Sequence, residues 1–314
     1  MAESTALAPD APKASRPTPV PDGAATKPRR NWVPYALLAP GLVWLFVFFV
    51  LPMVTLASQS LQEGDVYDGY VFTGNVGIYG EALSAYWTQL VRSLAYAGTA
   101  TVLALLLGYP LAYFIAQKAG RWKNIVLILV IAPFFTSFLI RTLAWQTILA
   151  DTGPVTAFAQ RIGVTNLLNS VGLINNDTLL YSQFAVIAGL TYNFLPFMIL
   201  PLYSTLERLD PRLIEAAGDL YASPFETFRR VTWPLSLPGV VAGTLLTFIP
   251  ASGDFINAQL LGNTQTTMIG SVIDAQFLRV LNYPLAAALS FVLLVIIVTM
   301  VSVYVRRAGT EELL

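Results

Sequence analysis

The sequence predicts an all-α integral membrane protein with six transmembrane helices and both termini in the cytoplasm. Only 11% of its 314 residues are charged and 55% are hydrophobic. In a soluble domain, roughly a quarter of all residues are charged. The mean hydropathy is +0.63. Six apolar runs are each long enough for the roughly 20 residues that a spanning helix needs. Basic residues gather on alternate connecting segments, and this asymmetry sets the orientation of the spans.

The six apolar runs define one membrane domain over residues 32–308. Residues 1–31 are rich in Ala, Pro, Ser and Thr without apolar periodicity and predict a disordered tail, and residues 309–314 form a short second tail. Internal prolines in two of the runs are compatible with membrane helices. The predicted spans are Pro34–Ser58, Arg92–Ala116, Ile125–Leu149, Tyr181–Tyr203, Leu237–Leu261 and Pro284–Val305.

The distribution of Lys and Arg predicts which ends of these spans lie inside the cell. Fourteen of the 18 basic residues fall on segments that share a side with the N-terminus. Because positive residues concentrate on the cytoplasmic side, the termini are expected there. The fourteen are Lys13, Arg16, Lys27, Arg29, Arg30, Lys118, Arg121, Lys123, Arg208, Arg212, Arg229, Arg230, Arg306 and Arg307.

The composition also excludes most kinds of catalytic and metal-binding site in this chain. The sequence has no Cys and no His, which excludes disulfides, thiol catalysis, the usual zinc ligands and His-dependent nucleophiles. No G-x-x-x-x-G-K-[ST] phosphate-binding loop occurs, so this chain is not expected to bind ATP. We therefore expect no catalytic residues, no bound metal and no cofactor in this chain.

A polar segment at residues 206–236, between the fourth and fifth spans, has strong helix-capping signals. Asp210 can cap a first helix that has Pro211 at its first position. Ser223 and Glu226 form a potential capping box for a second helix that begins at Pro224. Two capped amphipathic helices on the cytoplasmic side predict a docking element for another protein; an ordinary helical hairpin is the alternative. One face of the first helix contains Leu213, Ala216, Ala217 and Leu220.

This segment resembles the EAA loop of ABC importer permeases. The matching positions are Glu215, Ala216, Ala217, Val231 and Pro234. Tyr221 stands where the family pattern has Gly, and Trp233 where it has Leu. The resemblance implies a coupling helix that sits in a groove of a cytoplasmic ATPase. The implied coupling residues are Leu213, Glu215, Ala216, Ala217, Gly218, Asp219, Ser223 and Pro224.

The resemblance extends over nearly all of residues 34–305. Four runs are similar to the first permease subunit of spermidine/putrescine ABC importers: LGYPLAYFIA (107–116), APFFTSFLIRTLAW (132–145), LPFMILPLYSTLERLD (195–210) and IGSVIDAQFL (269–278). This implies a type I importer permease fold, alternating access and a bacterial inner-membrane location. The relatives include permeases for phosphonates, opines or ferric iron, which stay open as alternatives, as does a secondary transporter without an ATPase.

The resemblance also implies partners. These are a second, usually non-identical permease chain, two ATPase subunits that bind ATP and Mg²⁺, and an extracytoplasmic polyamine-binding protein. Membrane lipid surrounds the assembly, and nothing points to nucleic acid. The predicted outer segments are acidic, which would attract a cationic solute; the exclusion of Lys and Arg from outer loops gives a similar pattern.

Two charges inside the predicted spans are candidates for the solute path. Arg141 and Asp254 lie at similar depths in the third and fifth spans. A charge near the middle of a bilayer usually faces a partner or a water-filled path. Either the two residues pair as a structural clamp, or Asp254 faces the path and contributes to solute recognition.

Aromatic and amide side chains at span levels are further candidates. An organic cation binds over aromatic faces, with about 0.5–2 kcal/mol for each contact. Packing or an interfacial belt is the alternative for each ring. These candidates are Trp145, Tyr192, Asn193 and Phe255, with Asp274 and Gln276 as weaker ones.

Overall fold

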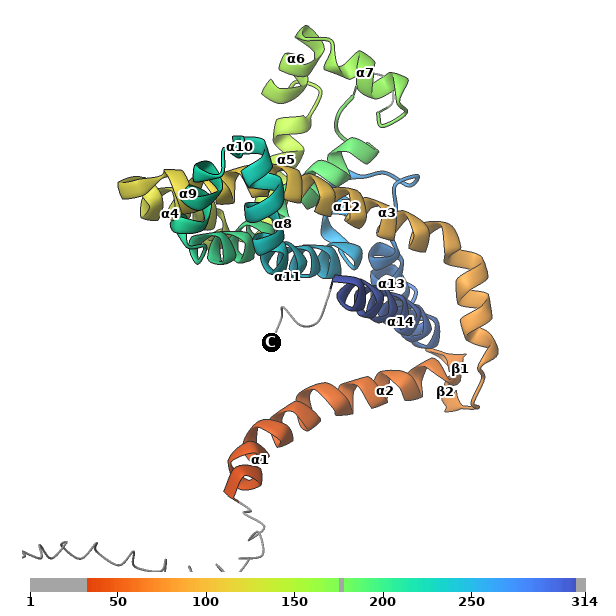
Figure 1. The fold of residues 1–314 in the computed structure, drawn as a ribbon. Coiled ribbons are helices and arrows are strands. Elements are labelled where there is room, and N and C mark those ends of the chain that lie inside the picture. The colour runs from red at the N-terminus through yellow and green to blue at the C-terminus, as the bar shows by residue number, and fades with distance from the viewer. Residues whose placement is uncertain (1–32, 175–177, 309–314) are drawn as a thin grey trace, which may run out of the picture. The chain divides into compact units, whose positions relative to one another are not determined.

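The computed structural model describes residues 33–174 and 178–308. The two predicted tails therefore lie outside the described residues. Contacts divide the chain into two units, residues 1–52 and 53–314, which are described separately. Figure 1 shows the order of the elements along the chain.

The described part of the first unit, residues 33–52, is the beginning of a helix and consists of apolar residues on every face. Helix α1 covers Val33–Leu45, a π-helical turn follows at Phe46–Val50, and α2 covers Leu51–Ser60. The rings of Trp44 and Phe48 lie 4.2 Å apart. A helix that is apolar all round is typical of a membrane span, and Tyr35–Ser60 has the length and hydropathy of one.

Long helices dominate the second unit. After the antiparallel hairpin of β1 (Gln62–Asp65) and β2 (Gly69–Phe72), the chain forms α3 (Gly77–Tyr113). The remaining long helices are α8 (Gln183–Glu207), α11 (Trp233–Ser252) and α14 (Tyr283–Ala308). The shorter helices are α4 (Lys123–Ile131), α5 (Phe138–Leu149), α6 (Pro154–Arg161), α7 (Val164–Ser170), α9 (Pro211–Asp219), α10 (Pro224–Thr227), α12 (Ile256–Leu261) and α13 (Ile269–Leu278).

Within the described residues, five helices are long and apolar enough to cross a membrane, or six if one bent pair counts as a single span. That pair is the predicted third span. Its halves, Gly120–Phe135 and Phe138–Leu149, meet at 96°, because Thr136 and Ser137 adopt extended backbone angles between them. The predicted third span, Ile125–Leu149, is therefore bent in its middle rather than formed by one continuous helix.

The predicted second and fifth spans also differ from the structure. Helix α3 begins at Gly77 rather than near Arg92, and its one non-helical residue, Tyr86, marks a kink. The fifth run does not form one helix: α11 ends at Ser252, and α12 begins only at Ile256. The three residues between them place Asp254 at a break in the helix.

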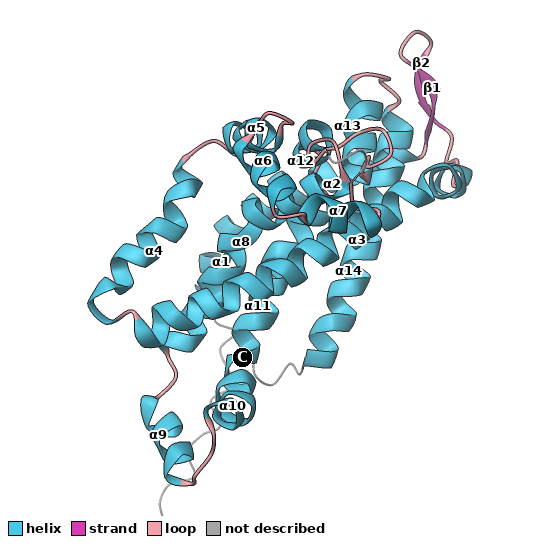
Figure 2. Ribbon diagram, turned by 90° about the horizontal axis from the view of Figure 1, so that it is seen from above, coloured by secondary structure: helices cyan, strands magenta, loops and turns pink. Residues whose placement is uncertain are grey.

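Helices α3, α8 and α11 pack together around the main core (Figure 2). Two glycines one turn apart, Gly239 and Gly243, permit the close approach of α11 to α8. A methyl group on Gly239 would lie 2.6 Å from Thr205 Oγ1, and one on Gly243 would lie 2.8 Å from Met198 Sδ. This small-xxx-small spacing is a common signal for close helix packing in membranes.

Figure 2 shows where the predicted docking loop and the helix break at the end of α11 lie. Helices α9 and α10 project at one end of α8 and α11, whereas α12, α13 and the β1–β2 hairpin lie at the other end. The predicted docking loop and the helix break at Asp254 therefore occupy different ends of the second unit. Any effect of one on the other passes along the long helices between them.

Candidate functional site

Helix α9 has a defined beginning and end. Asp210 Oδ1 accepts the Arg212 N–H at 3.0 Å, which confirms the predicted N-cap. At the other end, the Ala222 N–H donates to the Ala217 carbonyl (3.1 Å) and the Tyr221 N–H to the Gly218 carbonyl (2.9 Å). These two bonds form a Schellman motif. It requires a left-handed residue, and Tyr221 has φ +59°.

The left-handed tyrosine gives a testable expectation about loop stability. A residue with a Cβ in this conformation costs about 1–2 kcal/mol, whereas glycine adopts it freely. Replacing Tyr221 by glycine is therefore expected to stabilise the protein by about 1 kcal/mol, measured as a higher thermal midpoint of the purified protein. Tyr67, equally exposed but without a positive φ, is the control, because Tyr67→Gly relieves no such strain. A lower midpoint for Tyr221→Gly would contradict the account.

Helix α10 begins with the predicted capping box but is not a separate short helix. The Ser223 N–H donates to Glu226 Oε2 at 3.0 Å, and Ser223 Oγ accepts the Glu226 N–H at 3.3 Å. The helix continues through a π-helical turn at Phe228–Thr232 directly into α11. The prediction of two short helices was therefore wrong for the second one. Residues 224–252 form a single helical stretch, so the loop is joined rigidly to a long apolar helix.

Large apolar side chains are exposed on this otherwise polar loop. Leu220 is 81% exposed, Tyr221 97% and Phe225 70%, and Leu213 is half exposed. Glu215, Ala216, Gly218 and Asp219 are also exposed. We call Leu213, Leu220, Tyr221 and Phe225 the loop face. Exposed apolar groups at this density are typical of a protein-binding surface.

Ala217 is less exposed than the other members of the expected face, Leu213, Ala216 and Leu220. It lines a notch of about 320 Å³ together with Leu220 and Tyr221 of the loop face and with Thr227 and Arg230. Helix α9 contacts α10 and the π-helical turn, and these contacts partly cover this side of the helix.

Arg141 and Asp254 do not pair. The guanidinium carbon of Arg141 lies 5.3 Å from the ring centre of Phe134 and 5.6 Å from that of Phe138. Asp254 Oδ1 accepts the Asn257 N–H at 2.8 Å and so caps α12. The one ion pair between described residues joins Lys123 and Glu207. The clamp is therefore not present in this structure.

Three of the path candidates lie on α5 and α8. The rings of Trp145 and Tyr192 meet edge to face at 5.4 Å. The neighbouring Asn193 is buried, and its Nδ2 donates to Thr142 Oγ1 (3.2 Å) and Asn257 Oδ1 (3.0 Å). Asn257 was not among the candidates from the sequence, although it lies only three residues after Asp254 in the chain. These bonds join α5, α8 and α12 at the helix break.

Phe255 and Asp274 lie together in a second place. They line a pocket of about 290 Å³ between the α11–α12 break, α13 and α14. Asp274 Oδ2 accepts the Gln259 Nε2 amide at 2.9 Å, whereas Gln276 points elsewhere and donates to the Tyr86 hydroxyl at 2.9 Å. Phe277, one turn after Asp274, lines the same pocket and was missed because a single phenylalanine in an apolar run gives no signal.

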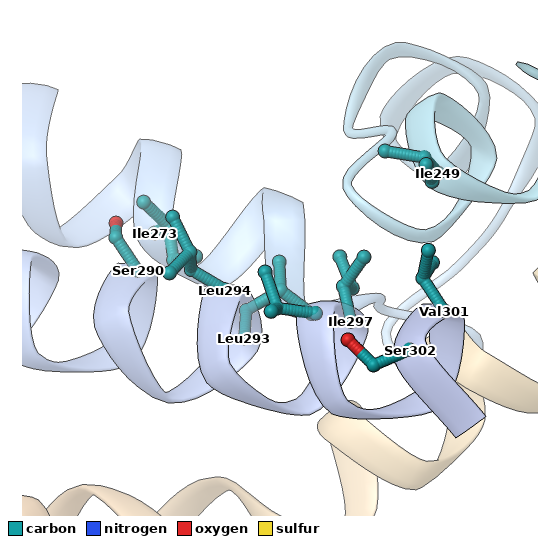
Figure 3. A pocket seen from close by; sticks show the side chains of 9 residues that line it. Ile249, Ile273, Ser290, Leu293, Leu294, Ile297, Val301 and Ser302 are labelled. Carbon is teal, nitrogen blue, oxygen red and sulfur yellow. The ribbon is translucent and has the colours of Figure 1, made fainter. Parts of the chain in front are cut away.

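A pocket of about 420 Å³ is an apolar groove along α14. Figure 3 shows side chains of α14 directed toward Ile249 of α11 and Ile273 of α13. Ser290 and Ser302 are its polar members, and it has no charged side chain. The groove therefore offers no counter-charge to an ionic solute. In the described part of the chain, no cluster of Asp and Glu residues could hold a metal ion.

Comparison with known proteins decides the family. Residues 104–308 match the model of the binding-protein-dependent transport system inner membrane component. The chain belongs to this family. This permease is 37% identical over 264 residues to the spermidine/putrescine transport system permease protein PotB of Haemophilus influenzae, with 84% of this chain and 90% of that protein covered. Identity to the protein of that name from Escherichia coli is 36% over 266 residues, covering 84% and 94%.

A solved structure has the same fold. The permease aligns with a chain in the crystal structure of a bacterial alginate ABC transporter in complex with an alginate pentasaccharide-bound periplasmic protein. The TM-score is 0.64 at 20% identity, over 90% of this chain and 96% of that chain. The chain is thus a multi-pass permease of the bacterial inner membrane, with an ABC importer fold and a transport role rather than an enzymatic one.

Proposed function

We propose that this permease moves polyamines such as spermidine and putrescine into the cytoplasm as one subunit of an ATP-driven importer. The observation that supports this most is the identity of 36–37%, over 84% of the chain, to permeases named for spermidine and putrescine. Acidic residues on the predicted outer segments agree with a cationic solute.

The assembly would contain two permease chains, of which the second is not identical to this one. Two cytoplasmic ATPase subunits would bind ATP and Mg²⁺, and an extracytoplasmic binding protein would deliver the polyamine. Six spans with both termini in the cytoplasm, as in a type I importer, follow from the distribution of Lys and Arg. The 96° bend then counts as part of a single third span.

The loop face would dock into the ATPase. Helix caps fix both ends of α9 and the start of α10, so the face is presented in a defined shape. Because α10 continues into α11 without a break, a movement of the docked loop becomes a movement of α11. Nucleotide-driven closure of the ATPase pair would in this way switch the permease between two states. Glu215 and Asp219 would supply the charged rim of the contact, and Ala216 and Gly218 are small enough for close approach of the partner.

The far end of α11 is where that movement would reach the solute. Asp254 and Phe255 occupy the break after α11. Asn193 of α8 donates to Asn257 just after this break, Tyr192 of α8 contacts Trp145 of α5, and Arg141 also lies on α5. We assign these residues and Asp274 to the path that opens in turn to each side. Asp254 would act there by fixing the start of α12 as well as by its charge.

Nucleotide hydrolysis by the reconstituted complex tests the proposed function. A binding protein loaded with spermidine should stimulate hydrolysis, and the same protein without ligand should not. Stimulation only by a phosphonate-, opine- or iron-loaded protein would reject the polyamine and retain the importer.

A further inference from the structure

We propose that the pocket formed by Phe255, Asp274 and Phe277 binds one protonated amino group of the solute. This inference rests on the proposed function, since it requires a cationic solute. Beyond the proposed function, it names the place in the permease that binds the solute and the amino group as the part of the solute that is bound. It also gives a role to Phe277, for which the sequence predicted none. We call the site the ammonium pocket.

The carboxylate of Asp274 has no counter-charge in the described chain. Its one hydrogen-bond partner among the described residues is the neutral amide of Gln259, and no ion pair between described residues involves it. Asp274 lies on the short helix α13 and is partly exposed, so its carboxylate is accessible to a ligand of opposite charge. The second oxygen of Asp274 is free of partners in the described chain and can accept from an ammonium group.

Two aromatic rings line the pocket beside this carboxylate. Phe255 and Phe277 both line the pocket. Their side chains are 39% and 42% exposed, so a ligand can reach them. A cation over a phenyl face is attracted by the ring quadrupole. The ring of Phe277 is held in place by Tyr283, with 5.1 Å between the ring centres, and Tyr283 in turn contacts Tyr70 at 5.4 Å. The Phe277 side of the aromatic wall is therefore supported by a row of packed rings.

The remaining lining favours an alkylammonium group over other ligand classes. Asp274 is the one charged residue that lines the pocket, and apolar side chains such as Ile273 and Leu293 form the rest together with two glycines. A phosphonate would meet a like charge there, and a neutral solute would leave that charge unpaired. An alkylammonium group satisfies both features, because its charge pairs with the carboxylate and its methylene groups contact the apolar wall.

Replacement of the carboxylate is the main test, on the complete complex with its ATPase and binding protein in proteoliposomes. Asp274→Asn is expected to lower the spermidine transported per ATP hydrolysed about tenfold, the effect of losing one charge-assisted hydrogen bond. Asp274→Glu should restore most of the transport. Hydrolysis stimulated by the spermidine-loaded binding protein should persist in both, because it reports assembly. The matched control is Asp151→Asn, an exposed carboxylate in the turn after α5, which should transport normally.

The aromatic wall gives an independent test in case Asp274→Asn fails to assemble. Phe277→Leu keeps an apolar side chain but removes the π face and should lower transport per ATP about threefold, whereas Phe277→Tyr should not. Two results would overturn the assignment of the ammonium pocket, provided that the wild-type complex transports spermidine. One is normal transport by Asp274→Asn, and the other is equal transport by the two Phe277 variants. Absence of spermidine transport by the wild-type complex would instead reject the polyamine itself.

Discussion

Replacing Leu220 by aspartate is expected to weaken the binding of the ATPase subunits to the permease at least tenfold. Leu220 directly follows α9 and is 81% exposed, so the substitution removes nothing from the core. Burial of a leucine side chain in an interface contributes about 1.5–3 kcal/mol, and about 1.4 kcal/mol corresponds to a factor of ten. The new carboxylate must also lose its water. The measurement is the amount of ATPase that copurifies with tagged permease over a range of ATPase concentrations.

The matched control is the same substitution at Leu167, an exposed leucine of α7. Helix α7 lies in a segment that the basic-residue pattern places outside the cell, where the ATPase has no access. Leu167→Asp should therefore leave copurification unchanged, while it imposes an equal change in charge. Equal retention of the ATPase by Leu220→Asp and wild type would show that the loop face does not dock.

Gly270→Ala is expected to destabilise the protein by about 1–3 kcal/mol, the usual cost of forcing an extra group into a packed site. A Cβ at this position would lie 2.4 Å from the Gly253 carbonyl oxygen and 2.9 Å from that of Asp254. Both atoms belong to the backbone of the α11–α12 break, so they cannot move aside as a side chain would. A lower thermal midpoint of the purified complex is the expected result.

A glycine with open space beside it is the control for that substitution. A methyl group on Gly98 of α3 would meet no atom of a neighbouring element within 4 Å. Alanine is a better helix former than glycine, so Gly98→Ala should leave the midpoint unchanged or raise it. If Gly270→Ala behaved in the same way, the packing of α13 on the helix break would not contribute to stability as described.

Hydropathy predicted some helices well and others badly, for a physical reason. The runs at Tyr181–Tyr203 and Pro284–Val305 agree with α8 and α14 to within a few residues, because neither helix is interrupted. Hydropathy does not report backbone angles. It therefore gave no sign of the bend at Thr136, nor of the break after Ser252.

The same distinction applies to the candidate site. The caps of α9 and α10 were predictable because every partner lies within four residues in the chain. The Arg141–Asp254 clamp depended on which helix faces are adjacent, and similar depth in the membrane does not determine that. Phe277 became a candidate only when the fold placed it beside Asp274. Local signals were thus reliable, and contacts between helices needed the structure.

The central claim is that this permease couples ATP hydrolysis to polyamine import. Its most direct test is the hydrolysis rate of the reconstituted complex in nanodiscs, measured with the binding protein empty, loaded with spermidine or loaded with a neutral control solute. We expect that the spermidine-loaded form alone stimulates hydrolysis and that Leu220→Asp abolishes the stimulation. An equal rate in all three conditions, with an assembled and active complex, would contradict the claim.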